Sequence, residues 1–351
     1  MAAAPVAEAA APGSAPRTSA AGGIPTSGWI LALVLLLMPT FASDFFLVQV
    51  FGWAFVLGTI ALSLQFLAGY GGMVSLVQMT VAGFAGYMVA ILGTSGLAQI
   101  SLGWPFWLAV PTAIALAVLF GTLSGALAVR TAGIYTIMIT LAIAAAFFYF
   151  TRQNETVFGG FLGFNGVRAP VFWGIDWRAP VPFYYLCLAW AAIAWGLVVW
   201  VVRAPFGLAL QGIRDNPRRM AALGFDVTAH RIAAYAFAAF LAAPAGILLT
   251  WLNGQIAPGT VGIGPVIDVL VIAVIGGLGR PIGPFVGALL YVLLRIFAMD
   301  LLVALGLSGQ RFQLVIGLGF LLTVLFSPDG ILGLWERHIR PRLAGERGGG
   351  R

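Results

Sequence analysis

The segment IRDNPRRMAALGFDVTAHR, residues 213–231, lies between two long apolar stretches and carries four arginines in a chain with only 8% charged residues. Asn216 is a good helix N-cap, and Pro217 is favoured at the first helical position. Gly224 can adopt the left-handed conformation that ends a helix. The segment therefore predicts a two-turn helix, Arg218 to Leu223, between two longer apolar helices.

The chain as a whole is strongly apolar. Of its 351 residues, 61% are hydrophobic, whereas soluble domains have about 45–50%. The sequence therefore predicts an integral membrane protein with an all-α, polytopic fold.

Several kinds of chemistry are excluded by what the composition lacks. All eighteen residues of the Lys+Arg count are arginine, so a P-loop lysine, a Schiff base and a Ser-Lys dyad are impossible. Cys187 is the one cysteine, which excludes a disulfide and a cysteine-based metal site within one chain. His230 and His338 have no metal-ligand partner at a useful spacing. We predict no catalytic residue, no metal site and no bound cofactor on this chain.

A helix needs about 20 apolar residues to cross about 30 Å of hydrocarbon. By that criterion the sequence predicts about ten transmembrane or re-entrant helices. They are expected at about 28–48, 50–68, 73–92, 105–129, 133–150, 182–202, 231–252, 264–279, 281–298 and 311–327.

The predicted domains follow from these spans. Residues 1–27, rich in Ala, Pro, Gly and Ser, predict a disordered cytoplasmic tail; residues 28–330 are expected to form a transmembrane domain; and residues 331–351 are expected to form a cytoplasmic tail. Within the transmembrane domain we expect a cytoplasmic loop at 203–230 and the longest outside loop at 151–181.

The distribution of arginines predicts the sidedness of the chain. If both termini are cytoplasmic, thirteen of the eighteen arginines lie inside, four lie outside and Arg295 lies within a span. The four outside are Arg152, Arg168, Arg178 and Arg311. This asymmetry satisfies the positive-inside rule. Because the net charge of +7 is scattered between apolar spans, it does not indicate nucleic-acid binding.

The short predicted helix needs an external contact, because isolated helices of this length are marginal in water. Met220 and Leu223 on one face, with Arg214, Arg218 and Arg219 around them, suit insertion into a groove of a soluble partner. The alternative is that the helix lies on the membrane with its arginines at anionic headgroups.

Longer stretches resemble a known family. RAPFGLALQGIRDNPRRMAALGFDVTAHRIAAYAFAAFLAAPAG, residues 203–246, is similar to the cytoplasmic coupling loop and following span of permease subunits of branched-chain amino-acid ATP-binding-cassette (ABC) importers, in particular the LivM-like member. The other similar stretches are GYGGMVSLVQMTVAGFAGYMVAIL (69–92), GIYTIMITLA (133–142), FGGFLGFNGV (158–167), VIGGLGRPIGPFVGALL (274–290) and LFSPDGILGL (325–334). The resemblance covers roughly residues 50 to 334. Departures at Val77 and at AGY (85–87), where substrate could pass, affect the identity of the cargo more than the class of transporter; in addition, Arg231 stands where a lysine is frequent in the family.

The resemblance implies a coupling helix that docks in a cleft of a separate ATP-hydrolysing subunit. The residues it assigns to coupling are Arg214, Asn216, Arg218, Arg219, Met220, Leu223 and Gly224. The absence of lysine agrees, because ATP and Mg must then bind to a partner chain.

The resemblance also implies the partners and the location. We expect a second homologous permease, two ATPase subunits, a periplasmic solute-binding protein and the lipid bilayer, in a bacterial inner membrane. The cargo would be branched-chain or related amino acids, carried by alternating access without covalent chemistry. Similar permeases carry urea and amides, so the cargo stays open. The alternative function is a self-contained secondary transporter or channel for a small polar solute.

Glycine-rich pieces at 69–72, 276–279 and 283–287 interrupt the apolar pattern at membrane depth. Irregular backbone is tolerated there only beneath other protein or beside a water-filled cavity. It either lines a substrate path or permits close helix packing. The candidate path glycines are Gly69, Gly72, Gly276, Gly277 and Gly279.

Polar residues give two further candidate stripes along the path. Ser75 and Gln78, three residues apart, would share one helical face near Thr80. The second stripe comprises Tyr135, Thr136 and Thr140. Such stripes face a cavity or another helix rather than lipid.

Asp268 and Arg295 are the ionisable residues deepest within predicted spans. They would form a structural pair across neighbouring spans. A proton relay through Asp268 would instead suit a secondary carrier.

Overall fold

The computed structural model describes residues 33–304, apart from 98, 132 and 173, together with residue 317. The predicted tails, 1–27 and 331–351, and the predicted span at 311–327 therefore lie outside the described residues. The chain divides into two units, residues 1–42 and residues 43–351.

In the first unit, Leu33 to Leu37 are helical and a short 3₁₀ helix, η1 (Met38–Thr40), follows. The prediction of one helix over 28–48 is wrong, because the helical structure ends at Thr40 and a new helix begins after Ser43. The amide of Leu47 donates to the carbonyl of Ser43 at 3.1 Å, as in the first turn of a helix. The sequence carries signals for this break, because Pro39, Thr40, Ser43 and Asp44 interrupt the apolar pattern, and the prediction did not use them.

The second unit contains five helices long and apolar enough to cross a membrane, counted over the described residues. They are the continuous helix Phe46–Tyr70, made of η2 (Phe46–Gly52), α2 (Trp53–Gln65) and η3 (Phe66–Tyr70), with α4 (Phe106–Ala128), α5 (Ile134–Gln153), α7 (Pro180–Arg203) and α10 (Val227–Asn253). Three further apolar helices are α3 (Gln78–Leu92), α11 (Ile263–Gly276) and α12 (Gly283–Ala304). These helices confirm an all-α membrane protein.

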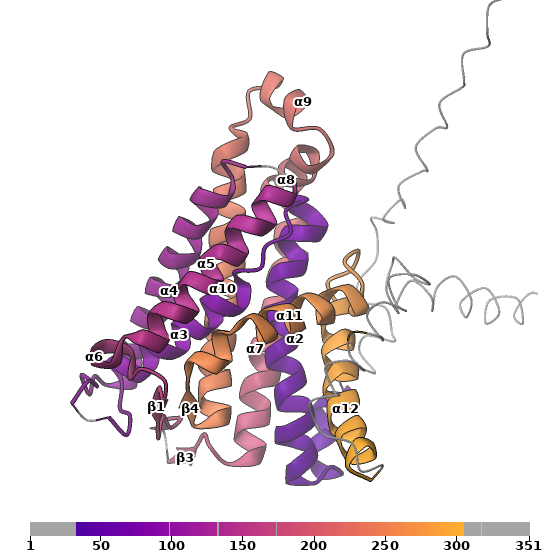
Figure 1. The fold of residues 1–351 in the computed structure, drawn as a ribbon. Coiled ribbons are helices and arrows are strands. Elements are labelled where there is room, and N and C mark those ends of the chain that lie inside the picture. Colours follow the sequence, from indigo (N-terminus) through magenta and orange to yellow (C-terminus); the bar gives the residue numbers. More distant parts are fainter. Residues whose placement is uncertain (1–32, 98, 132, 173, 305–316, 318–351) are drawn as a thin grey trace, which may run out of the picture. The chain divides into compact units, whose positions relative to one another are not determined.

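Helix α10 lies at the centre and packs against α3, α4 and α2 (Figure 1). Small residues allow the close crossings. A side-chain carbon on Gly246 would overlap the backbone of Ala82 in α3, and one on Gly125 of α4 would overlap the ring of Tyr235. The core therefore depends on small residues that let helix backbones approach closely, as in other membrane bundles.

The loops at one end of the bundle form small strands that the sequence did not predict. β1 (Phe164–Asn165) pairs antiparallel with β4 (Gln255–Ile256), and β2 (Val171–Phe172) pairs with β3 (Ile175–Asp176). The short helices α6 (Glu155–Phe158) and η4 (Pro258–Val261) lie in the same loops. The predicted outside loop is thus folded onto the bundle rather than extended.

The opposite end of the bundle carries α8 (Pro205–Asp215) and α9 (Pro217–Ala222) (Figure 1). Because Gly125 packs on Tyr235, the end of α4 with Arg130 lies beside the start of α10. The arginines predicted to be cytoplasmic in these loops therefore share one end. Which side of a membrane this end faces remains a prediction.

Candidate functional site

The short helix predicted from the sequence is present as α9, one residue earlier than expected. The side chain of Asn216 accepts a hydrogen bond from the amide of Arg219 at 2.9 Å, and Pro217 occupies the first helical position. Gly224 follows with φ +90°. Asp226 caps α10 by accepting from the amide of Ala229 at 2.9 Å. The start of α9, its end and the start of α10 are therefore each set by residues within one helical turn of that position.

The exposed surface of α9 differs from the prediction. Leu223 is 67% exposed, and Arg218 and Arg219 are also exposed. Met220, however, is only half-exposed and its sulfur lies against Gly212 of α8. Met220 thus packs partly against α8, while Leu223 is the more exposed apolar side chain; that both contact a partner stays a prediction.

Arg214, at the end of α8, points back toward the bundle. Its Nη1 donates to the carbonyl of Gly69 at 2.6 Å, and its Nε donates to Asp215 at 2.9 Å. The side chain thus connects the loop to the first glycine-rich piece.

That piece breaks the helix. After Tyr70, Gly71 turns, Gly72 has φ +66°, and Met73–Val77 are non-helical until α3 begins at Gln78. The predicted helix over 73–92 is therefore too long. The amide of Leu76 donates to Thr140 Oγ1 at 3.1 Å, so a side chain from another helix satisfies it in place of a helical carbonyl.

The break gathers buried polar side chains, although not on one helical face as predicted. Ser75 precedes α3, whereas Gln78 and Thr80 belong to it. All three are at most 1% exposed. Ser63 of α2 donates to Gln78 Oε1 at 3.2 Å, but Gln78 Nε2 and Thr80 Oγ1 make no hydrogen bond to any described residue. Unpaired polar atoms at membrane depth are costly, so this cluster is a candidate site.

The second predicted stripe is split. Thr136 and Thr140 are buried, while Tyr135 is 69% exposed on the other side of α5. Thr140 Oγ1 also bonds the carbonyls of Thr136 and Ile137 at 3.0 Å. The structure therefore brings Thr140, but not Tyr135, to the break at 71–77.

A second break separates α11 from α12. Gly277 has φ +102°, and a side-chain carbon on Gly276 would overlap the backbone of Gly283. Gly279, in contrast, has open space around it. Gly276 therefore serves close packing of the two helices, which leaves Gly277 and Gly279 free to turn the chain.

Asp268 and Arg295 interact electrostatically, and each also contacts an aromatic side chain. The carboxylate of Asp268 accepts a hydrogen bond from the hydroxyl of Tyr291, and the positive charge of Arg295 attracts the same carboxylate. The guanidinium of Arg295 lies over the Trp53 ring, 5.5 Å from its centroid. These contacts favour a structural role.

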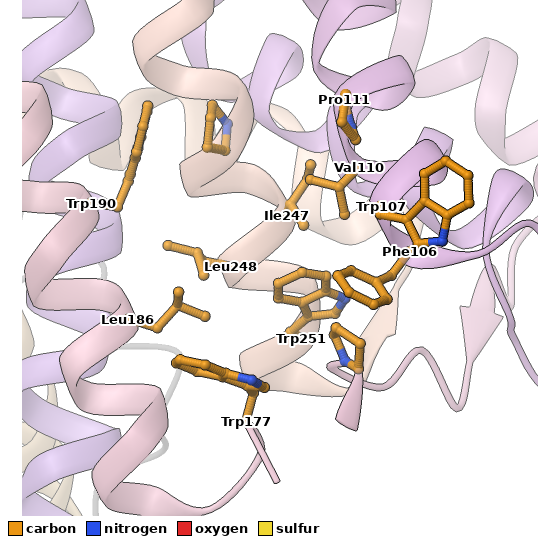
Figure 2. Close-up of a pocket in the computed structure, with 12 residues that line it drawn as sticks. Phe106, Trp107, Val110, Pro111, Trp177, Leu186, Trp190, Ile247, Leu248 and Trp251 are labelled. Atoms are coloured by element: carbon orange, nitrogen blue, oxygen red, sulfur yellow. The ribbon is translucent and has the colours of Figure 1, made fainter. Parts of the chain in front are cut away.

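An apolar groove of about 390 Å³ lies between α4, α7 and α10 (Figure 2). It is lined by Phe106, Trp107, Val110, Pro111, Pro170, Trp177, Leu186, Trp190, Pro244, Ile247, Leu248 and Trp251. No ionised side chain lines it, so it offers nothing to the charged ends of an amino acid. Among the described residues no cluster of His, Cys, Asp and Glu could hold a metal ion.

Sequence reasoning missed Ser63 and Gln65, both buried on α2. The sequence did contain a signal for both residues, because they are polar side chains within an apolar helix. Ser63 reaches Gln78, and Gln65 Nε2 donates to the carbonyl of Leu278 at 2.7 Å.

Comparison with known proteins places the chain in a family. The family model for the permease component of branched-chain amino acid transport systems matches residues 46–325. No solved structure matches.

Curated relatives agree with that match. The chain is 23% identical over 303 residues to the high-affinity branched-chain amino acid transport system permease protein LivM of Escherichia coli, covering 80% of this chain and 70% of the relative. It is 22% identical over 269 residues to the ribose import permease protein RbsC of Haemophilus influenzae, covering 74% and 79%. It is 30% identical over 142 residues to BraD of Pseudomonas aeruginosa, a high-affinity branched-chain amino acid transport system permease protein, covering 40% and 44%.

The resemblance drawn from the sequence to permeases of ABC importers is thereby confirmed, and the family is one of transport subunits rather than enzymes. The chain belongs to the branched-chain amino acid transport system permease family.

Proposed function

We propose that this chain is the transmembrane permease subunit of an ABC importer for branched-chain or related amino acids. It works by alternating access with a second permease, two ATPase subunits that bind ATP and Mg, and a periplasmic solute-binding protein. The complex lies in a bacterial inner membrane with both termini of this chain in the cytoplasm.

The observation that carries this proposal is α9 with its exposed Leu223. A six-residue helix, Pro217–Ala222, is capped at both ends and projects from the bundle (Figure 1). Leu223 is 67% exposed directly after this helix, on which Arg218 and Arg219 are also exposed. An apolar side chain presented in this way suits the groove of a soluble partner.

Two observations favour an amino acid as cargo. Relatives named for branched-chain amino acids match this chain over up to 80% of its length. The buried break at 71–77 also provides hydrogen-bonding groups, including Ser75 and Gln78, that could meet the polar ends of an amino acid when the path opens.

The test is co-purification of the ATPase from the native membrane. Tagged wild type, Leu223→Asp and a control, Leu162→Asp, are compared. Leu162 is 75% exposed in the loop at the other end of the bundle, so the control carries the same chemical change away from α9.

We expect wild type and Leu162→Asp to purify with an ATP-hydrolysing subunit and Leu223→Asp to lose it. Purification of the wild type without such a subunit, with solute transport by the chain alone, would instead establish a secondary transporter or channel.

A further inference from the structure

Three segments are connected by hydrogen bonds: the last turn of α8, the end of the helix Phe46–Tyr70 and the break between α11 and α12. Arg214 Nη1 donates to the carbonyl of Gly69, 2.6 Å away. The stem of Arg214 also covers Gly72, where a side-chain carbon would lie 2.6 Å from its Cγ. The loop thus holds the first break by a polar and an apolar contact.

A second contact joins the first break to the second. Gln65, which is fully buried, donates from Nε2 to the carbonyl of Leu278 at 2.7 Å. Gly69 lies directly against that same carbonyl, and no side chain would fit between them. A movement of Gly69 toward Leu278 would therefore push directly on the Leu278 carbonyl.

The chemistry of Arg214 suits this position. Gly69 is in the last turn of a helix, where carbonyls lack an intrahelical partner and the helix dipole is negative. A guanidinium bond to such a carbonyl is charge-assisted and stronger than a neutral one. Arg214 is itself 39% exposed, and the neighbouring Arg218 and Arg219 are exposed on α9 as well.

We propose that Arg214, with Gln65, is a positioning residue that transmits movement of the α8–α9 loop to both helix breaks. This inference rests on the proposed function, because the movement is that driven by the ATPase. It separates two roles within the loop: Leu223 holds the ATPase, whereas Arg214 couples its work to the path.

The test uses the complete transporter reconstituted in liposomes, with leucine uptake and ATP hydrolysis measured together. The variants are Arg214→Gln, Arg214→Lys and Gln65→Leu. The control is Arg130→Gln, an exposed arginine at the same end of the bundle.

We expect Arg214→Gln to keep the ATPase subunit and hydrolyse ATP, while leucine moved per ATP falls about tenfold or more, as loss of a charged hydrogen bond implies. Gln65→Leu should reduce the ratio in the same direction. Arg214→Lys should recover part of it, and Arg130→Gln should match the wild type. An unchanged ratio in Arg214→Gln, or loss of the ATPase from it, would overturn the inference.

A second measurement uses the wild type alone, so it does not depend on a variant folding. Amide hydrogen exchange is followed before and after ATP addition. Exchange should change together in α8, in residues 69–77 and in residues 277–283. A change confined to α8 and α9 would refute the link, whereas absence of any ATPase in the purified complex would refute the proposed function itself.

Discussion

Replacement of Gly246 by alanine should destabilise the bundle. A side-chain carbon there would overlap the carbonyl group and Cα of Ala82 in α3. Backbone atoms cannot rotate away, so α3 and α10 must separate. Overpacking of this kind costs about 1–3 kcal/mol, against about 0.5–1 kcal/mol that alanine contributes over glycine within a helix. We expect the free energy of unfolding to fall by about 2 kcal/mol, near the upper end of the difference between these two ranges.

Gly196→Ala is the matched control. Gly196 lies inside α7, and no atom lies within 4 Å of the position of an added carbon. The same chemical change should therefore stabilise the chain by about 0.5–1 kcal/mol.

The assay is thermal unfolding of the purified chain in detergent. At about 2–4 °C per kcal/mol, Gly246→Ala should unfold about 4–8 °C below wild type and Gly196→Ala about 1–4 °C above it. If Gly246→Ala unfolded at or above the wild-type temperature, the close crossing of α3 and α10 would be refuted.

Three further predictions concern the loop and the break. Asn216→Ala should cost α9 about 0.5–2 kcal/mol, seen as faster amide exchange in residues 217–223; unchanged exchange would show that the cap contributes nothing. Leu223→Ala removes a side chain that is 67% exposed, so burial at a partner would contribute about 1–2 kcal/mol and its loss should weaken ATPase binding about 5–30-fold; equal affinity by titration would exclude Leu223 from the interface. Gln78→Leu removes a buried amide nitrogen that has no hydrogen-bond partner among the described residues. The unfolding temperature should therefore stay unchanged while leucine uptake falls. Normal uptake would show that Gln78 serves only packing.

The loop was predictable where the determinants are local. Asn216, Pro217 and Gly224 act within one turn of their own positions, and the structure shows each in the predicted role. The packing of Met220 against Gly212 was not predicted, because α8 was not foreseen. Residues 205–215 had been assigned to a loop, so the surface at Gly212 that Met220 covers was missing from the reasoning.

The breaks were predictable in place but not in geometry. Glycines at 69–72 and 276–279 do mark interruptions of helices, whereas the third predicted piece, 283–287, is helical and lies within α12. However, the helical face assigned to Ser75 and Gln78 was wrong, since the amide of Leu76 bonds Thr140, 64 residues away. Helical spacing describes only short-range neighbours, and this hydrogen bond depends on how α5 packs. Gln65 was missed for the same reason, because its acceptor at Leu278 lies 213 residues further on.

The central claim is that this chain forms the path and another subunit supplies the energy. The most direct test is uptake of labelled leucine into liposomes containing the chain, first alone and then with its second permease, ATPase subunits and binding protein. We predict no uptake by the chain alone and uptake by the complete complex only when ATP is present. Uptake by the chain alone, without ATP, would contradict the account.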